Sequence, residues 1–162
     1  MPNSMVNRNA QTAKMVVFDY GRTLYDRETD RFFPDAVPVI RALAKKYRLS
    51  IVSVSRVEEE KGRIKALREN GLIDHFEEII FTASGEEKSQ KYNELLQSAG
   101  LAANEVVVVD DYIIRGIAWG NKSGATTIWF QNGKFAKLNP DGETGQPDYT
   151  IHSLSELIEI LQ

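Results

Sequence analysis

The chain has 162 residues, of which 42% are hydrophobic and 27% are charged, and its formal net charge is −3. This length fits one ordinary domain that can bury a core without staples, and the absence of cysteine excludes disulfides, thiolate metal sites and a cysteine nucleophile. The acidic balance gives no basic footprint for nucleic acid, and no apolar run is long enough to span a bilayer. We therefore expect a cytoplasmic protein with neither nucleic acid nor a membrane as a partner.

The first half of the chain alternates between predicted strands and helices. Residues 1–14 are polar without an apolar period, and they predict an N-terminal tail rather than a signal peptide. Short apolar runs predict strands at residues 15–19, 49–54 and 78–82. Apolar residues at helical spacing predict the intervening helices, of which the first opens at Pro34-Asp35, the second covers 57–70 and the third ends at Gly100.

The second half continues this alternation around the most strongly apolar run in the chain. Residues 105–109 are apolar and β-branched, as a central strand buried on both faces requires. A helix lined by Ile113, Ile114, Ile117 and Ala118 is predicted to end at Gly124, and residues 125–129 predict a fifth strand. The remaining pattern predicts a turn-rich loop that could hold a hairpin, an edge strand and a helix opened by a capping box, at residues 131–148, 149–151 and 153–161.

Strands that alternate with helices at this spacing predict an α/β fold with a doubly wound, mostly parallel sheet of five to six strands and helices on both faces. We expect residues 15–162 to form one domain. Because parallel strands all end at the same edge of a sheet, their polar end residues should gather at one crevice. These residues are Asp19, Ser53 or Ser55, Lys88 and the pair Asp110-Asp111.

This combination of side chains suits phosphoryl chemistry. A carboxylate such as Asp19 can approach a dianionic phosphoryl group only if other positive charges reduce the repulsion, and Lys88 could supply one of them. Mg²⁺ could supply the other, because it prefers oxygen ligands and needs only one or two carboxylates besides substrate phosphate. Asp19, the Gly21 carbonyl and Asp111 would suffice, with Ser53 donating a hydrogen bond to a phosphoryl oxygen.

Four motifs in this order resemble those of the haloacid dehalogenase-like (HAD) superfamily. Asp19 with Thr23 is similar to its first motif, Ser53 to the second, Lys88 to the third, and Asp111 in Val-Val-Asp-Asp to the acidic fourth. The resemblance implies a Mg²⁺-dependent hydrolase, a phosphatase, in which Asp19 is the nucleophile and forms an aspartyl-phosphate. The substrate would be a phosphorylated small molecule or macromolecule, and a homo-oligomer is compatible with the sequence.

The chain departs from the family pattern at two positions. Gly21 stands where most HAD phosphatases carry a second Asp, which protonates the leaving group and activates water. Gly116, preceded by Arg115, stands where a further acid is usual, so the metal site is expected to have one carboxylate fewer. Asp26 or Asp110 could substitute for the missing groups. Neither insertion point of the family holds a long segment, which predicts a member without a large cap domain.

Other functions remain open at this stage. The two glycines fit a weak or inactive module that binds a phosphorylated ligand, and a haloacid dehalogenase would need no acid for its halide leaving group. A response-regulator receiver is disfavoured because its acidic pair should follow the first strand, whereas here the pair follows the fourth. Lys91 competes with Lys88 for the lysine role, and the sequence assigns no role to Arg22, Arg56 or Arg115.

Overall fold

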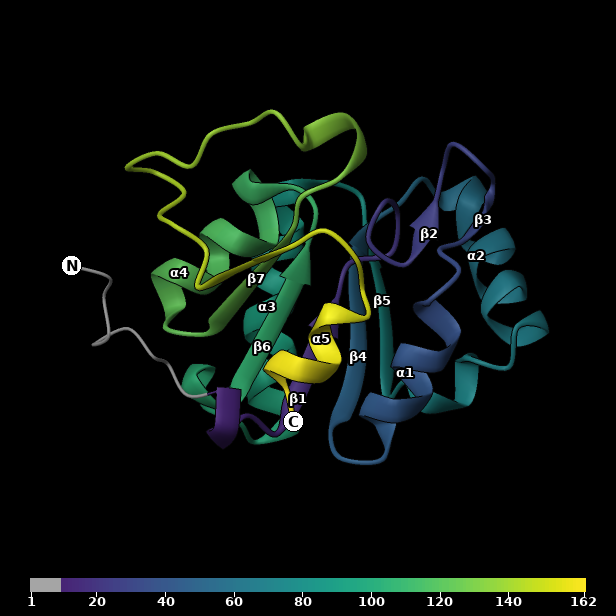
Figure 1. The fold of residues 1–162 in the computed structure, drawn as a ribbon, viewed down its shortest axis with the longest axis horizontal. Coiled ribbons are helices and arrows are strands. Elements are labelled where there is room, and N and C mark those ends of the chain that lie inside the picture. The colour runs from purple at the N-terminus through teal and green to yellow at the C-terminus, as the bar shows by residue number, and fades with distance from the viewer. Residues whose placement is uncertain (1–9) are drawn as a thin grey trace.

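Six parallel strands form one sheet in the order β5-β4-β1-β6-β7-β8 (Figure 1). The computed structural model describes residues 10–162, apart from the side chain of Gln11, so residues 1–9 of the tail predicted at 1–14 lie outside the described part, whereas Ala10–Thr12 form a 3-10 turn. From β1 the chain first builds the β4 and β5 side of the sheet and then crosses to the β6 side. The strands are β1 (Met15–Phe18), β4 (Arg48–Val54), β5 (Glu78–Thr82), β6 (Val106–Asp110), β7 (Thr126–Phe130) and β8 (Tyr149–Ile151). The predicted doubly wound α/β fold is confirmed.

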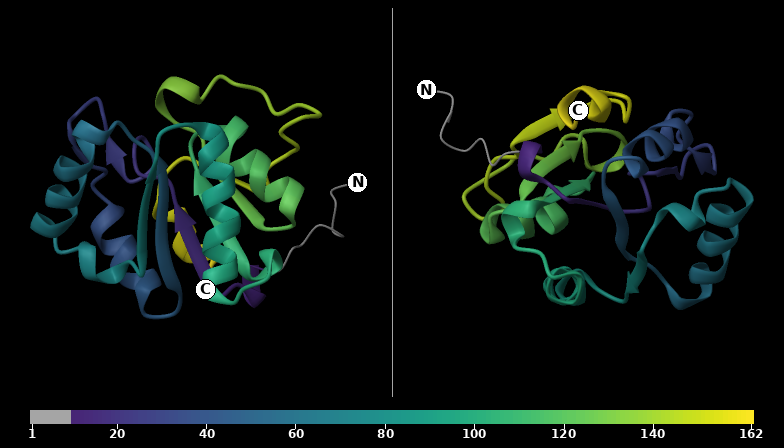
Figure 2. Two further views of the ribbon diagram at one scale, coloured as in Figure 1. Left: turned by 180° about the vertical axis from the view of Figure 1, so that it is seen from behind. Right: turned by 90° about the horizontal axis from the view of Figure 1, so that it is seen from below.

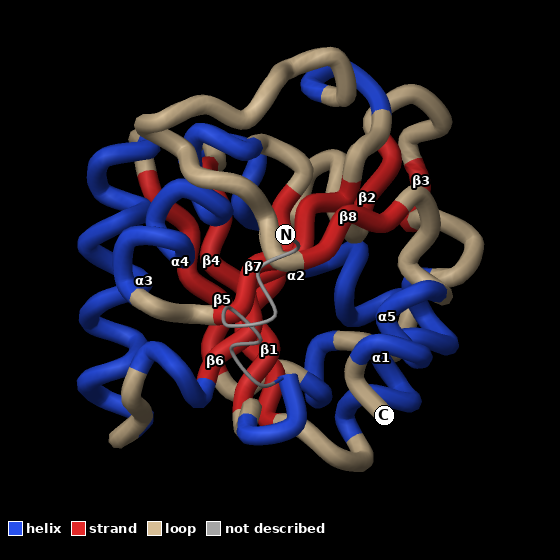
Figure 3. Tube along the Cα trace, turned by 60° about the vertical axis from the view of Figure 1, so that its left-hand side comes forward, coloured by secondary structure: helices blue, strands red, loops and turns tan. Residues whose placement is uncertain are grey.

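Helices cover both faces of the sheet. One face carries α1, α5 and the inner side of α2, whereas α3 and α4 pack on the other (Figure 2 and Figure 3). The helices are α1 (Ala36–Ala44), α2 (Val57–Glu69), α3 (Gly85–Ala99), α4 (Ala118–Ser123) and α5 (Glu156–Ile160). No helix among the described residues combines the length and the apolar character that a bilayer span requires.

The two central strands show why both faces are apolar. On β6, Val107 and Val109 belong to the α1 face, while Val106 and Val108 belong to the α3 face, and all four are fully buried. Successive side chains of a strand point to opposite faces, so a continuous valine run supplies two cores at once. Strand β1 alternates in the same way and pairs with both β4 and β6.

Two helices end at the glycine residues that the sequence predicted. Gly100 and Gly124 adopt positive φ angles of 70° and 95° directly after α3 and α4. This left-handed conformation is the common way to end a helix, and glycine adopts it without steric cost. The predicted ends of both helices are therefore confirmed.

Three local predictions need correction. Residues between β1 and α1 form a hairpin that the sequence did not predict, made of β2 (Tyr25–Asp26) and β3 (Arg31–Phe32). Residues Ile113–Ile117 form a π-helix that precedes α4 and packs against β6, β7 and α3, and Ile114 is 54% exposed rather than inward. The loop at 131–148 contains one short 3-10 turn, Gly133–Phe135, and no hairpin.

Candidate active site

The crossing between β1 and β6 creates a crevice at the carboxyl edge of the sheet. In open α/β sheets ligands bind where the strand order reverses in this way. Asp19 follows β1 directly, and its backbone N–H donates to the Val109 carbonyl at 3.0 Å. Asp110 ends β6 and is followed by Asp111, so the strand pairing alone places three carboxyl groups together. One oxygen from each lies within 4.8 Å of the others.

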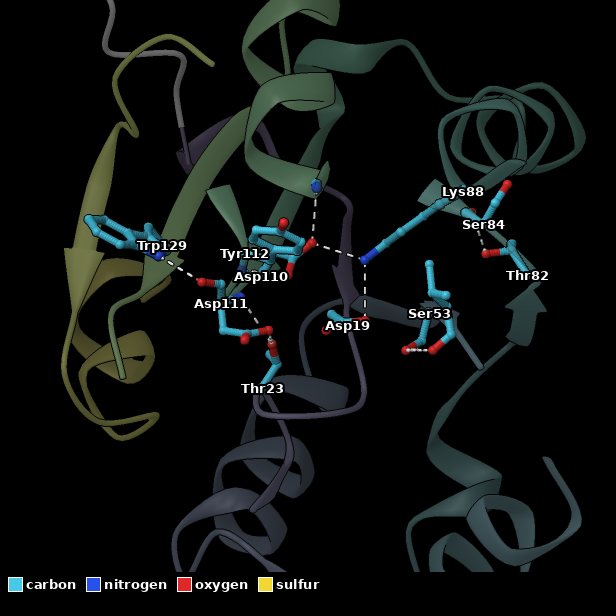
Figure 4. A network of polar contacts seen from close by, with 12 residues as sticks. Asp19, Thr23, Ser53, Thr82, Ser84, Lys88, Asp110, Asp111, Tyr112 and Trp129 are labelled. Carbon is cyan, nitrogen blue, oxygen red and sulfur yellow. Dashed lines mark hydrogen bonds and ion pairs between the residues drawn. The ribbon is translucent and has the colours of Figure 1, made fainter. Parts of the chain in front are cut away.

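Lys88 neutralises part of this charge from the first turn of α3. Its ammonium group donates to Asp19 Oδ1 at 3.2 Å and to Asp110 Oδ2 at 2.9 Å (Figure 4). The side chain is only 2% exposed. Burial alone would lower the pKa of Lys88, but the two carboxylates outweigh that effect and raise the pKa well above its usual value. Lys88 is therefore a fixed positive charge.

Asp19 is held as an ionised carboxylate by this lysine. Burial is the largest single influence and raises the pKa of Asp19, but attraction to the Lys88 ammonium together with side-chain hydrogen bonds outweighs it, and the resulting pKa lies below the usual value. An ionised carboxylate is the form that can act as a nucleophile. Asp19 lines a pocket of about 120 Å³ together with Ser53, Lys88 and both acids after β6.

Asp111 shows that the cluster fits a cation. Its Oδ1 accepts a hydrogen bond from Thr23 Oγ1 at 3.1 Å, whereas its buried Oδ2 has no hydrogen-bond partner (Figure 4). Burial and the neighbouring charges of Asp19 and Asp110 raise the pKa of Asp111 to about 9. A buried carboxyl oxygen without a donor, facing two other carboxyl groups, matches the oxygen ligands that Mg²⁺ prefers. The donor set present is therefore compatible with a divalent cation.

Asp110 fills the space where the resemblance places a further acid. Its Oδ2 accepts from the Gly116 N–H at 2.9 Å, and a Cβ at Gly116 would lie only 2.5 Å from that oxygen. A side chain at position 116 and the carboxyl group of Asp110 thus exclude each other. Asp110 thus brings a third carboxyl group beside Asp19 and Asp111, although it also pairs with Lys88, and the expectation of one metal-binding carboxylate fewer stays a prediction.

Ser53 approaches the pocket from β4, on the side opposite β6. Its hydroxyl accepts a hydrogen bond from Arg63 Nη1 at 3.1 Å, and the same guanidinium donates to the Val54 carbonyl at 3.2 Å. Ser55, its rival in the sequence, donates to the Arg56 carbonyl and does not line the pocket. The geometry therefore favours Ser53 over Ser55.

Arg63 is a residue that the sequence analysis missed. It comes from α2, is 9% exposed, and lies with its guanidinium carbon 4.8 Å from the centre of the Tyr20 ring. Its one signal in the sequence is helical spacing: Arg63 stands four residues before Leu67, which faces the core. That spacing places an arginine on the inner side of α2.

The other residues considered from the sequence lie at differing distances from the site. Lys91 pairs with Glu94 at 2.9 Å on the outer side of α3, which removes it as a rival of Lys88. Asp26 accepts hydrogen bonds within the β2–β3 hairpin and does not line the pocket that holds Asp19, Asp110 and Asp111, called the acidic pocket below. Arg22 and Arg115 line the acidic pocket, and Arg56 does not.

An aromatic pair closes one wall of the same pocket. The rings of Tyr112 and Phe135 stack with centroids 3.8 Å apart, and the Arg115 guanidinium lies over the Tyr112 ring. Phe135 belongs to the 3-10 turn in the loop that follows β7. This loop therefore contributes part of the pocket wall.

Solved structures share this architecture. A HAD phosphatase from Thermococcus onnurineus superposes with a TM-score of 0.70 at 18% identity, over 91% of this chain and 97% of that one. A 2-haloacid dehalogenase from Pseudomonas syringae pv. Tomato superposes with a TM-score of 0.68 at 19% identity, over 92% and 98% of the two chains. At these identities the likeness shows the fold alone, and the fold is that of HAD-like hydrolases.

The sequence itself gives the family. Residues 3–130 match the haloacid dehalogenase-like hydrolases, so the chain belongs to that family. A glyceraldehyde 3-phosphate phosphatase from Pyrococcus furiosus is 27% identical over 94 residues. That alignment covers 56% of this chain and 39% of the relative, so the chain spans about two-fifths of the length of this curated relative.

Proposed function

We propose that this HAD-family hydrolase is a Mg²⁺-dependent phosphatase that works through an aspartyl-phosphate on Asp19. The observation that carries this proposal is the ion pair between Asp19 and Lys88, 3.2 Å long and almost fully buried. It keeps a carboxylate ionised at the mouth of a pocket that also holds a fixed positive charge and two further acids. That combination suits attack on an anionic phosphorus centre.

The chain offers a separate role for each side chain. Asp19 attacks phosphorus, Ser53 donates a hydrogen bond to a phosphoryl oxygen, and Lys88 offsets the charge that gathers in the transition state. Asp19, Asp111 and the Gly21 carbonyl would hold Mg²⁺, with Asp110 behind them. When bound, Mg²⁺ supplies Lewis-acid stabilisation of the phosphoryl oxygens.

The first chemical step, transfer of the phosphoryl group to Asp19, needs no proton donor when the leaving group is a stable anion. A bond forms from an Asp19 oxygen to phosphorus, the bond to the leaving oxygen breaks, and that oxygen keeps the electron pair. With Gly21 in place of an acid, no proton arrives, so acyl and aryl phosphates should be the best substrates. The name of the Pyrococcus furiosus relative includes a triose phosphate. Its leaving group is an alkoxide, which is harder to expel without a proton than a phenolate or a carboxylate.

Phosphate release from p-nitrophenyl phosphate and acetyl phosphate tests this function. The wild-type protein should release phosphate with Mg²⁺ and lose that activity with EDTA. The variant Asp19→Asn, which is nearly isosteric, should lose at least about 10³-fold in kcat because the nucleophile is gone. Equal activity in Asp19→Asn would contradict the mechanism.

A weak or inactive module that binds a phosphorylated ligand is the second candidate, because glycine at position 21 leaves no side chain there. That candidate predicts binding of inorganic phosphate without turnover of either substrate. We also propose that residues 15–162 form one domain without a large cap, since a two-strand hairpin is the added element between β1 and α1.

A further inference from the structure

The acidic pocket opens beside Gly21 into a larger groove. This groove has a volume of about 360 Å³ and is lined by Tyr20 after β1, by residues of the β2–β3 hairpin such as Tyr25, and by residues of α2 such as Glu59. Gly21, Arg27 and Arg63 line both spaces. The acidic pocket, at about 120 Å³, is the smaller of the two and contains Asp19, Ser53 and Lys88, so a phosphoryl group would bind there. The rest of a substrate would therefore lie in the groove. The bond between phosphorus and the leaving oxygen would then lie beside Gly21 and Arg63, where the two spaces meet.

Arg63 is fixed at this junction. Its Nη1 is held by the Ser53 hydroxyl and the Val54 carbonyl, while its Nη2 lies 3.6 Å from Glu59 Oε2. Glu59 is 34% exposed, so water weakens its pairing with the guanidinium. A Cβ on Gly21 would lie 3.6 Å from Arg63 Nη2 in ordinary van der Waals contact. The absence of a side chain at position 21 thus exposes a cation to whatever enters the groove.

We propose that Arg63 is a catalytic residue that stabilises the negative charge on the leaving oxygen. The inference depends on the proposed phosphatase function. As the bond from phosphorus to the leaving oxygen breaks, the electron pair stays on that oxygen and the guanidinium offsets its charge. Arginine cannot donate a proton at any working pH, so the leaving group departs as an anion. The site therefore selects phosphates of carboxylic acids and phenols and rejects alkyl phosphates.

The test measures kcat/KM for acetyl phosphate, p-nitrophenyl phosphate, phenyl phosphate and glycerol 3-phosphate, in order of increasingly basic leaving groups. Arg63→Met should slow phenyl phosphate by about 10²-fold, the usual cost of losing one such stabilising group, and acetyl phosphate far less. Arg63→Lys should keep part of the effect, and it serves as the second variant if Arg63→Met does not fold. The matched control is Arg68→Met, which removes an exposed arginine from the same helix and should change no rate.

The outcomes separate the inference from the function on which it depends. A purely structural role for Arg63 would slow all substrates by one factor, and that result would overturn the inference. Failure of the wild-type protein to cleave even acetyl phosphate, or activity that survives Asp19→Asn, would instead overturn the proposed function and the inference with it.

Discussion

The surroundings of Asp19 differ on its two sides, although each side has a glycine, Gly116 or Gly21, where an acid is usual in the family. On the β6 side, Gly116 lacks a side chain and Asp110 occupies the space, so a carboxylate remains against Lys88. On the α2 side, Gly21 lacks a side chain and the nearest polar group is the Arg63 guanidinium. On the β6 side, Asp110 supplies the negative charge that Gly116 lacks. On the α2 side, no acid replaces Gly21, and Arg63 places a positive charge there. The effect of replacing a motif acid by glycine therefore depends on which side chains lie next to that glycine in the folded protein.

Removal of Lys88 should have the largest effect on the β6 side. Lys88→Met leaves Asp19 and Asp110 buried without a cation, and losing one partner of a buried ion pair costs about 3–5 kcal/mol. Urea unfolding should show this loss, together with loss of activity. Lys91→Met is the matched control, since its exposed pair should contribute at most about 1 kcal/mol. Similar stability in the two variants would argue against a buried charge network.

An exchange of residues tests whether positions 110 and 116 share one space. Gly116→Asp should destabilise by about 1–3 kcal/mol because of crowding, and adding Asp110→Gly should recover part of that loss. Gly120→Ala is a control for crowding alone, since its Cβ would lie 2.5 Å from Thr127 Cγ2. Asp110→Gly should not rescue that variant. If the changes in unfolding free energy caused by the substitutions at 110 and 116 were strictly additive, the two positions would not share one space.

Mg²⁺ binding should depend on pH through Asp111. The pKa of this carboxyl is raised to about 9 without metal, so protons compete with Mg²⁺ below that value. Affinity should therefore rise with pH, approaching about tenfold per unit, or 1.4 kcal/mol, and binding should release protons. Calorimetry in two buffers of different ionisation enthalpy measures this release. In Asp111→Asn the proton release should disappear, and its persistence there would exclude Asp111 as the group that titrates.

The smallest expected effect concerns the start of α3, which carries Lys88. Ser84 caps this helix by accepting from the Glu87 N–H at 3.2 Å, and Glu87 in return accepts from the Ala83 N–H. Ser84→Ala should cost about 1 kcal/mol in thermal or urea unfolding. Ser98→Ala, an exposed serine near the other end of the helix, should change stability far less. If both variants lost the same amount, the cap would not be the cause.

The alternation of side chains along β6 held more information than the sequence analysis used. Val106 and Val108 face α3, so Asp110 faces α3 too, and Lys88 comes from that helix. The period of two thus predicts that Asp110, rather than Asp111, pairs with Lys88. Arg63 lay beyond such reasoning, because its place depends on how α2 docks beside β4.

The sequence by itself determined the alternation of the six sheet strands with helices, the glycine ends of α3 and α4, and the gathering of Asp19, Ser53, Lys88 and the acidic pair at one edge. Those features follow from local periodicity and from the common direction of parallel strands. The tertiary structure decided which carboxyl group fills the space at Gly116 and which charge faces Gly21. Such choices depend on contacts between residues far apart in the chain, at distances that no local pattern specifies.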